Sequence, residues 1–155
     1  KEGGQIWGMS RASATAVVGA VRAATKKPLM VKLSPNAPDI VDVALACIEA
    51  GADALSLINT IQAVAIDIEK ARPVFANIKA GLCGPTVKPI ALRMVYDVAL
   101  AVRALPKEKQ VPIVGIGGIA TWQDAVDRYS EELKEEELLE NDVNQKKGKK
   151  RIYIN

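Results

Sequence analysis

Histidine is missing from this sequence, and cysteine is scarce. The 155 residues include no histidine and only two cysteines, Cys47 and Cys83. The commonest general base and metal ligand is therefore absent, and the cysteines are too few for a disulfide framework or a zinc site. Lysine, the carboxylates, cysteine and a cofactor are left to carry any chemistry. The absence of histidine thus favours a borrowed cofactor and no metal.

Long hydrophobic runs and a dominant charge are missing as well. Lys, Asp or Pro interrupts each apolar stretch well before the roughly 18 to 20 residues of a membrane span, and no secretory signal is visible at the start. The 21 basic and 18 acidic residues are interleaved over most of the length, which argues against a face for nucleic acid. We expect a soluble, cytoplasmic protein that contacts neither membrane nor nucleic acid.

Short apolar runs alternate with alanine-rich segments of helical spacing. With 49% apolar residues, the chain has enough material for one core. The runs predict buried strands at 29–33 (LMVKL), 54–58 (ALSLI) and 111–116 (VPIVGI). The spacing predicts helices at 13–25, at 39–50 with Gly51 as a left-handed cap, at 89–105 and from 122 onward.

This alternation is typical of parallel strands covered by helices, as in an α/β barrel or a doubly wound sheet. The strand ends favour the barrel, because a barrel concentrates polar groups at the carboxyl ends of its strands. Such groups lie at or after the ends of all three runs: Lys32, Ser34 and Asn36, then Asn59 and Thr60, then Gly115, Gly117 and Gly118. A complete TIM (β/α)8 barrel needs about 250 residues, so we expect a partial barrel that is too short to close.

The composition changes near residue 127. Beyond it an acidic run, SEELKEEELLEND, is followed by a basic run, QKKGKKR, and a short RIYIN end. Blocks of like charge are usually solvated faces or tails. We therefore expect two parts, a partial α/β barrel over residues 1–127 and a charged helical or flexible tail over residues 128–155.

Four strings occur in one order: VKLSPN at 31–36, SLINT at 56–60, GLCGPTVKPIALRMVY at 81–96 and VPIVGIGGI at 111–119. Together they resemble the dihydroorotate dehydrogenase family, most closely its class 1B catalytic subunit, a flavin-dependent α/β barrel. The resemblance implies FMN-dependent oxidation of dihydroorotate to orotate in de novo pyrimidine biosynthesis. It also implies a partner subunit that carries FAD and an iron-sulfur cluster.

The resemblance assigns five residues to FMN: Lys32, Ile58, Gly84, Gly117 and Gly118. A fixed cation such as the Lys32 ammonium stabilises the negative charge of reduced flavin near N1; the alternative is an ordinary strand-end lysine. Ile58 matches a residue whose backbone touches the flavin. The glycines match positions of close backbone approach, although glycines after strands are often only turns.

Asn59 and Thr60 match the pair that hydrogen-bonds the pyrimidine substrate, dihydroorotate or orotate. An amide beside a hydroxyl complements the donor and acceptor edges of such a ring. The alternative is a pair of turn residues after a strand, which would be the simpler interpretation without the family.

Neither cysteine matches the catalytic base of the family, so no catalytic residue is assigned. Cys83 stands where the family usually has serine, and the family's catalytic cysteine belongs to a loop directly before Lys1. We expect Cys83 to be a small loop residue, Cys47 a core residue, and the chain alone to be catalytically inert.

Three departures from the family stand beside these matches. Residues 79–81 read Lys-Ala-Gly in place of Thr-Gly-Gly, and the connection ALPKEKQ at 104–110 is longer than usual. After residue 127 the family continues into a second flavin-phosphate segment containing Gly-Thr, whereas this chain enters its acidic run.

Two other interpretations stay open. One is the flavin barrel of a dihydropyrimidine dehydrogenase, which has similar motifs; the other is a truncated fragment that catalyses nothing. Open strand edges invite association, so a homo-oligomer is a further partner expectation.

Overall fold

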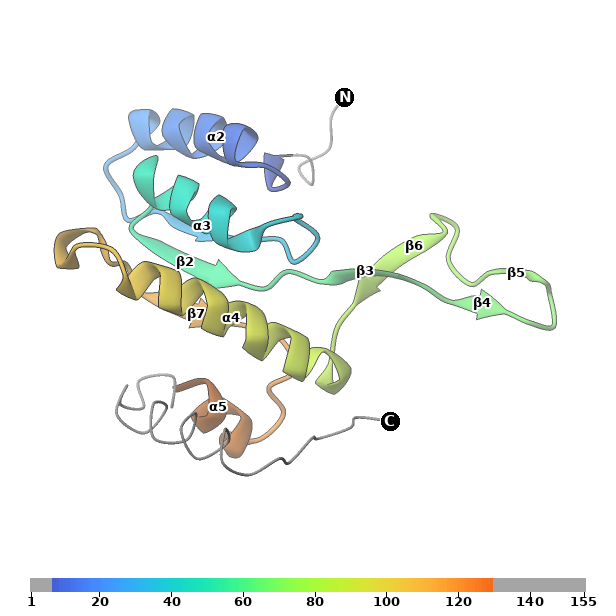
Figure 1. Cartoon of the computed structure of the whole chain (residues 1–155). Helices are drawn as coiled ribbons and strands as arrows, with labels where there is room; N and C mark the ends of the chain where they lie inside the picture. Colours follow the sequence, from blue (N-terminus) through green and yellow to red (C-terminus); the bar gives the residue numbers. More distant parts are fainter. Residues whose placement is uncertain (1–6, 130–155) are drawn as a thin grey trace, which may run out of the picture.

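A computed structural model describes residues 7–129, in which strands and helices alternate along the chain (Figure 1). The body of the molecule consists of β1 (Met30–Lys32), β2 (Ala54–Leu57) and β7 (Ile113–Gly115), with helices α2 (Arg11–Ala24), α3 (Ile40–Glu49), α4 (Lys88–Arg103) and α5 (Trp122–Tyr129). Short 3-10 turns, η1 (Pro85–Val87) and η2 (Lys107–Lys109), flank α4. All three predicted strands and all four predicted helices are present.

The three strands form one parallel sheet in the order β1-β2-β7. Its register aligns Val31, Leu55 and Ile113 in one row, and Lys32, Ser56 and Val114 in the next. The prediction of parallel strands alternating with helices is therefore confirmed as a mixed α/β arrangement.

One face of this sheet builds the core. Leu33, Leu55 and Leu57 are at most 2% exposed and join the buried side chains of α2, α3 and α4 in one hydrophobic cluster. Burial of each leucine stabilises the fold by about 1.5–3 kcal/mol. Because strand side chains alternate between faces, the intervening residues point the other way. On that second face Met30 and Val114 are 55% and 44% exposed.

Local signals in the sequence set the ends of the helices. The side chain of Ser10 accepts the amide of Ser13 at the start of α2, and that of Asp39 accepts the amide of Asp42 at the start of α3. Each pairing satisfies an amide that the first turn of a helix leaves without a partner. Helix α3 ends before Gly51 at φ 102°, as the left-handed cap predicted.

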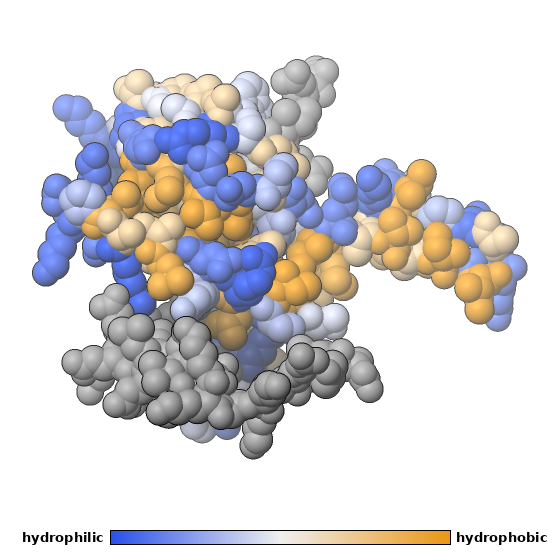
Figure 2. Space-filling model, viewed as in Figure 1, coloured by the Kyte–Doolittle hydropathy of each residue, from blue (hydrophilic) through white to orange (hydrophobic). Residues whose placement is uncertain are grey.

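An antiparallel arm between β2 and α4 departs from the predicted pattern. It consists of β3 (Ile61–Val64) paired with β6 (Lys79–Leu82), and of β4 (Ile66–Asp67) paired with β5 (Arg72–Pro73). The arm projects from the body, and Figure 2 shows apolar surface along it. Its apolar side chains are exposed, among them Ile68 at 88%.

Within residues 7–129, no helix is long and apolar enough to cross a membrane. The charged tail predicted for residues 128–155 lies, from residue 130, outside the described residues, so the division near residue 127 stays a prediction.

Candidate functional site at the carboxyl ends of the strands

Main-chain pairing continues beyond the strands and brings the predicted site residues to one edge of the sheet. Asn59 donates its amide to the Leu33 carbonyl at 3.0 Å, and Ile58 donates its amide to the Ile116 carbonyl at 3.1 Å. Lys32 ends β1 next to Leu33. The segments that follow the three strands are therefore fixed side by side at the carboxyl edge of the sheet.

A cleft of about 520 Å³ lies between this edge and the helices α2 and α3, whose apolar side chains form much of its wall. Three of the predicted residues, Lys32, Asn59 and Thr60, border it. Ser34 and Asn36 add further polar groups, and apolar side chains such as that of Val31 form the rest of the wall. A volume between about 300 and 1,000 Å³, mostly apolar with a few polar groups, is typical of small-molecule sites. The structure thus brings the lysine and both substrate candidates to the border of one cavity.

The side chain of Lys32, at the end of β1, is exposed. A lysine within an apolar strand is costly when it is buried, but here it occupies the face of the sheet away from the helix-packed core. Within residues 7–129, its ammonium has neither an ion pair nor a hydrogen bond. The charge is therefore available to a ligand on the open face of the sheet.

Asn36 positions the segment that carries Thr60. Its Nδ2 donates to the Thr60 carbonyl at 3.1 Å, and its Oδ1 accepts the amide of Gln62 at 2.9 Å. The hydroxyl of Ser34 in turn accepts the Asn36 amide at 3.2 Å. The sequence marked Asn36 only as a polar residue after a strand; its partners lie about two dozen residues away and leave no local signal.

The side chains of Asn59 and Thr60 are both exposed at the cleft. Asn59 Oδ1 accepts the Thr60 amide at 2.9 Å, which directs the Asn59 Nδ2 group away from its own backbone. A Cβ atom at Gly81 would lie 2.4 Å from Thr60 Oγ1, so the arm approaches this hydroxyl closely. The pair presents amide N–H donors and a hydroxyl, which suits the edge of a polar ring.

Two of the predicted flavin glycines, Gly117 and Gly118, lie in the connection after β7 and form what we call the glycine corner. Gly117 and Gly118 have φ values of 110° and 71°, which side chains rarely adopt. A Cβ at Gly118 would lie 2.6 Å from the Lys88 backbone, and one at Gly117 would lie 3.7 Å from Ile58. Within residues 7–129 the Gly118 amide has no acceptor. Glycine at 118 is therefore required by the close approach of α4. The Gly118 amide is the main-chain group here that could donate to the phosphate or ring oxygens of a flavin.

Gly84 lies before η1, at the end of the arm, with φ 89°. A Cβ there would meet nothing within 4 Å. Its conformation requires glycine, but its surroundings are open, so it contributes a turn and accessible backbone rather than a close contact.

An ion pair joins Lys88 and Asp124, and it was not predicted from the sequence. Lys88 Nζ donates to Asp124 Oδ1 at 2.5 Å, and Asp124 Oδ2 accepts the amides of Ala120 and Thr121 at 2.9 and 2.8 Å. The Lys88 ammonium, and then these two amides, hold the pKa of the Asp124 carboxyl well below its usual range. The Thr-x-x-Asp spacing at 121–124 was an available signal for a helix start.

Both cysteines lie where the sequence predicted. Cys47 is 1% exposed within the core, and burial raises the pKa of its thiol to about 11. Cys83 is an exposed residue that directly follows β6. Within residues 7–129 no cluster of three potential metal ligands occurs.

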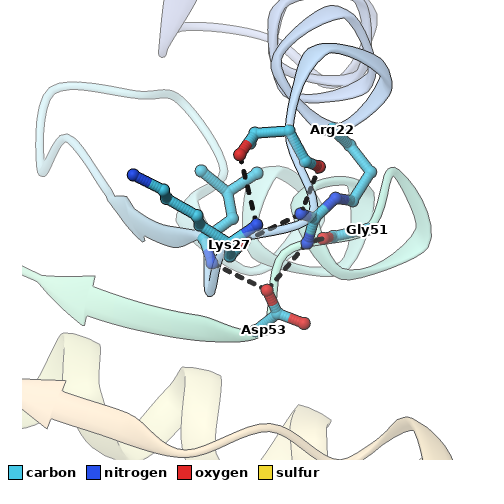
Figure 3. Close-up of polar contacts among 6 residues, drawn as sticks. Arg22, Lys27, Gly51 and Asp53 are labelled. Atoms are coloured by element: carbon cyan, nitrogen blue, oxygen red, sulfur yellow. Dashed lines mark hydrogen bonds and ion pairs between the residues drawn. The ribbon is translucent and has the colours of Figure 1, made fainter.

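The opposite edge of the sheet is tied together by Arg22, at the end of α2 (Figure 3). Its guanidinium donates to the Asp53 carboxylate at 2.8 Å and to the Thr25 and Lys27 carbonyls at 2.6 and 2.8 Å. Asp53 also accepts the amide of Leu29 at 2.7 Å. These contacts join the segments that enter β1 and β2, so this amino edge has a stabilising role.

Comparison with known proteins agrees with the motifs. The profile of the family described as dihydroorotate dehydrogenase matches residues 1–130. Proteins of Pelobacter propionicus, Geobacter sulfurreducens and Petrotoga mobilis, each named dihydroorotate dehydrogenase B (NAD(+)), catalytic subunit, are 55% identical to this chain over 127 residues. The aligned segment makes up 82% of this chain and 39–40% of those proteins. The chain thus spans about 40% of the length of these relatives.

Parallel strands with polar groups and glycines at their carboxyl ends define an α/β protein whose candidate ligand site lies at that edge. With the profile covering most of its length, the chain belongs to the dihydroorotate dehydrogenase family. The resemblance to the class B catalytic subunit is confirmed by the names of these relatives.

Proposed function

We propose that this chain provides the flavin- and substrate-binding edge of a dihydroorotate dehydrogenase of class 1B, which oxidises dihydroorotate to orotate in pyrimidine biosynthesis. The observation that carries the proposal is the cleft at the carboxyl edge, because it brings together Lys32, Asn59 and Thr60, which the family motifs assign to flavin and substrate. The names of the relatives favour dihydroorotate over other dihydropyrimidines as substrate.

We also propose that the sheet belongs to a TIM barrel. In such a barrel helices cover the outside, and the inner face of the strands is filled by layers of side chains. The row of Lys32, Ser56 and Val114 lies on the face away from the helix-packed core, as an inner layer would. The division into residues 1–127 and 128–155 is part of the same proposal.

FMN, when bound, supplies the group that accepts hydride from the substrate. Lys32 would hold its ammonium beside the ring and stabilise negative charge there. Ile58 has its amide engaged with Ile116, so its carbonyl is the main-chain group left for contact. Gly117 and Gly118 would offer backbone to phosphate or ring oxygens, and Gly84 an accessible turn.

Asn59 and Thr60 bind and orient the pyrimidine ring in this proposal. The Asn59 amide N–H groups donate to carbonyl oxygens, and the Thr60 hydroxyl donates or accepts according to the edge it faces. Asn36 and Gly81 fix the position of Thr60, the first by a hydrogen bond and the second by leaving room for the side chain. The proposal assigns binding, rather than proton abstraction, to these residues.

The proposal extends to the partners and the location of the chain. A class 1B catalytic subunit works with a subunit that carries FAD and an iron-sulfur cluster, and we propose such a partner, a homo-oligomer and a cytoplasmic location. Light scattering of the purified chain tests the homo-oligomer.

Titration of the chain with FMN, followed by quenching of flavin fluorescence, tests the cofactor part. Lys32→Ala should weaken binding by about tenfold, since one charge-assisted contact is worth roughly 1.5–3 kcal/mol. Lys26→Ala removes an equal charge from an exposed position before β1 and should leave affinity unchanged. A folded chain that binds no FMN, or equal losses in the two variants, would count against the proposal.

A further inference from the structure

The glycine corner belongs to a short connection that is held at its start by the sheet. Ile116 donates its amide to the Leu57 carbonyl at 2.6 Å, and its carbonyl accepts the amide of Ile58 at 3.1 Å. Residues 117–119 follow directly. Their starting point is therefore as fixed as the central strand of the sheet.

The same connection is held at its end by a carboxylate. Asp124 Oδ2 accepts the amides of Ala120 and Thr121, and also the Thr121 hydroxyl at 2.9 Å. Its other oxygen, Oδ1, is left for Lys88, the first residue of α4. One side chain thus joins the end of the glycine connection to the start of a helix that packs against the sheet.

Lys88 contacts this connection through its backbone as well. A Cβ atom at Gly118 would lie 2.6 Å from the N and Cα atoms of Lys88, so the glycine lies directly against the first turn of α4. Lys88 therefore meets residue 118 through its main chain and residues 120–121 through Asp124. A shift of the ion pair would move the connection relative to the helix.

The environment of the pair makes it stronger than a surface ion pair. The side chains of Lys88 and Asp124 are 33% and 14% exposed, whereas Arg93 and Asp97, which pair on the same helix, are 59% and 36% exposed. Exposed pairs contribute little because water screens them. Partly buried, charge-assisted hydrogen bonds fix geometry more firmly. Arg93 and Asp97 thus provide a control of the same chemistry away from the corner.

We propose that Lys88 and Asp124 are positioning residues that set the conformation of residues 117–119, and through it the affinity of the glycine corner for the flavin. The inference rests on the proposed function for the identity of the ligand. Neither residue is required to touch the flavin; the pair acts by holding Gly117 and Gly118 in their left-handed conformations.

A purely local explanation is that Asp124 only caps α5. The two explanations separate at Lys88. Lys88→Met removes the link from Asp124 to α4 and leaves Asp124 able to accept the amides of Ala120 and Thr121. Lys88→Arg restores a cation and should restore the link. Arg93→Met removes the exposed pair on the same helix and serves as the matched control.

Hydrogen–deuterium exchange of the flavin-free chain tests the positioning directly. Peptides that cover residues 115–121 should exchange at least about fivefold faster in Lys88→Met and Asp124→Asn, with exchange near the unsubstituted rate in Lys88→Arg and Arg93→Met. Unchanged exchange in Lys88→Met would overturn the inference. This measurement requires no flavin, so it tests the positioning of residues 117–119 even if the unsubstituted chain binds no FMN.

FMN titration of the same four variants tests the consequence for the ligand. The dissociation constant should rise by about tenfold in Lys88→Met, in line with the loss of one charge-assisted contact, and Lys88→Arg should recover most of it. Faster exchange with unchanged FMN affinity would overturn the link between the pair and the ligand. Failure of the unsubstituted chain to bind FMN counts against the proposed function alone.

Discussion

At the scale of single residues, the site depends on side chains whose partners lie far away in the sequence. The motifs placed Lys32 near the end of one predicted strand and Asn59 and Thr60 after another, and all three border one cleft in the structure. Asn36 and the Lys88–Asp124 pair were not predicted, because their partners lie 24 to 36 positions away. Residue spacing within one helix or strand reveals local contacts only. Residues that contact another element can therefore be identified only from the three-dimensional structure.

Asp124 gives the stability of the chain a specific dependence on pH. Its pKa is lowered in the folded state, so its contribution is complete above the unfolded value of about 4 and is lost as the pH falls below it. Urea unfolding between pH 7 and pH 3 should therefore show a smaller loss of stability on acidification in Asp124→Asn than in the unsubstituted chain.

Asp53 and Asp67 also have lowered pKa values. They account for part of the stability that the Asp124→Asn variant should still lose on acidification. Asp97→Asn changes an exposed aspartate of α4 and controls for the loss of a charge. An identical pH profile for Asp124→Asn and the unsubstituted chain would contradict this role of Asp124.

At the scale of elements, the body could be predicted and the arm could not. Buried strands and amphipathic helices leave runs and periodicities in the sequence because one side of each must avoid water. The arm strands are paired with each other and exposed, so no burial pattern separates them from a loop. Its residues 61–82 contain alternating apolar residues, but only pairing in space makes them strands.

The junction between α3 and β2 depends on Gly51. At φ 102°, a Cβ would be strained, and it would lie 2.7 Å from Arg22 Cγ, within the cluster of Figure 3. Gly51→Ala should therefore lower the free energy of unfolding by about 1–3 kcal/mol. Urea denaturation measures this change.

Gly19→Ala is the matched control for that substitution. A Cβ at Gly19, within α2, meets nothing within 4 Å, so the change should raise stability by about 0.5–1 kcal/mol through helix propensity. FMN affinity should be unchanged in both variants, since Gly51 lies at the amino edge. Destabilisation of equal size in the two variants would refute the role assigned to Gly51.

At the scale of the whole molecule, the two edges of one sheet have different roles. The amino edge is joined by the Arg22 cluster, and the carboxyl edge carries the cleft and the glycine corner. This separation follows from parallel strands, because all their carboxyl ends meet at one edge. Parallel strands and their shared edge were predictable from alternation alone; the open second face of the sheet was not, since each strand reads as uniformly apolar.

The central claim is that the carboxyl edge of the sheet holds flavin and pyrimidine together. Its most direct test is the absorption spectrum of chain-bound FMN during titration with orotate, with uracil as a control ligand and Asn59→Ala as a control variant. We predict a saturable change in the flavin bands with orotate, little change with uracil, and loss of the orotate response in Asn59→Ala. A chain that binds FMN but whose flavin spectrum does not respond to orotate would contradict the account.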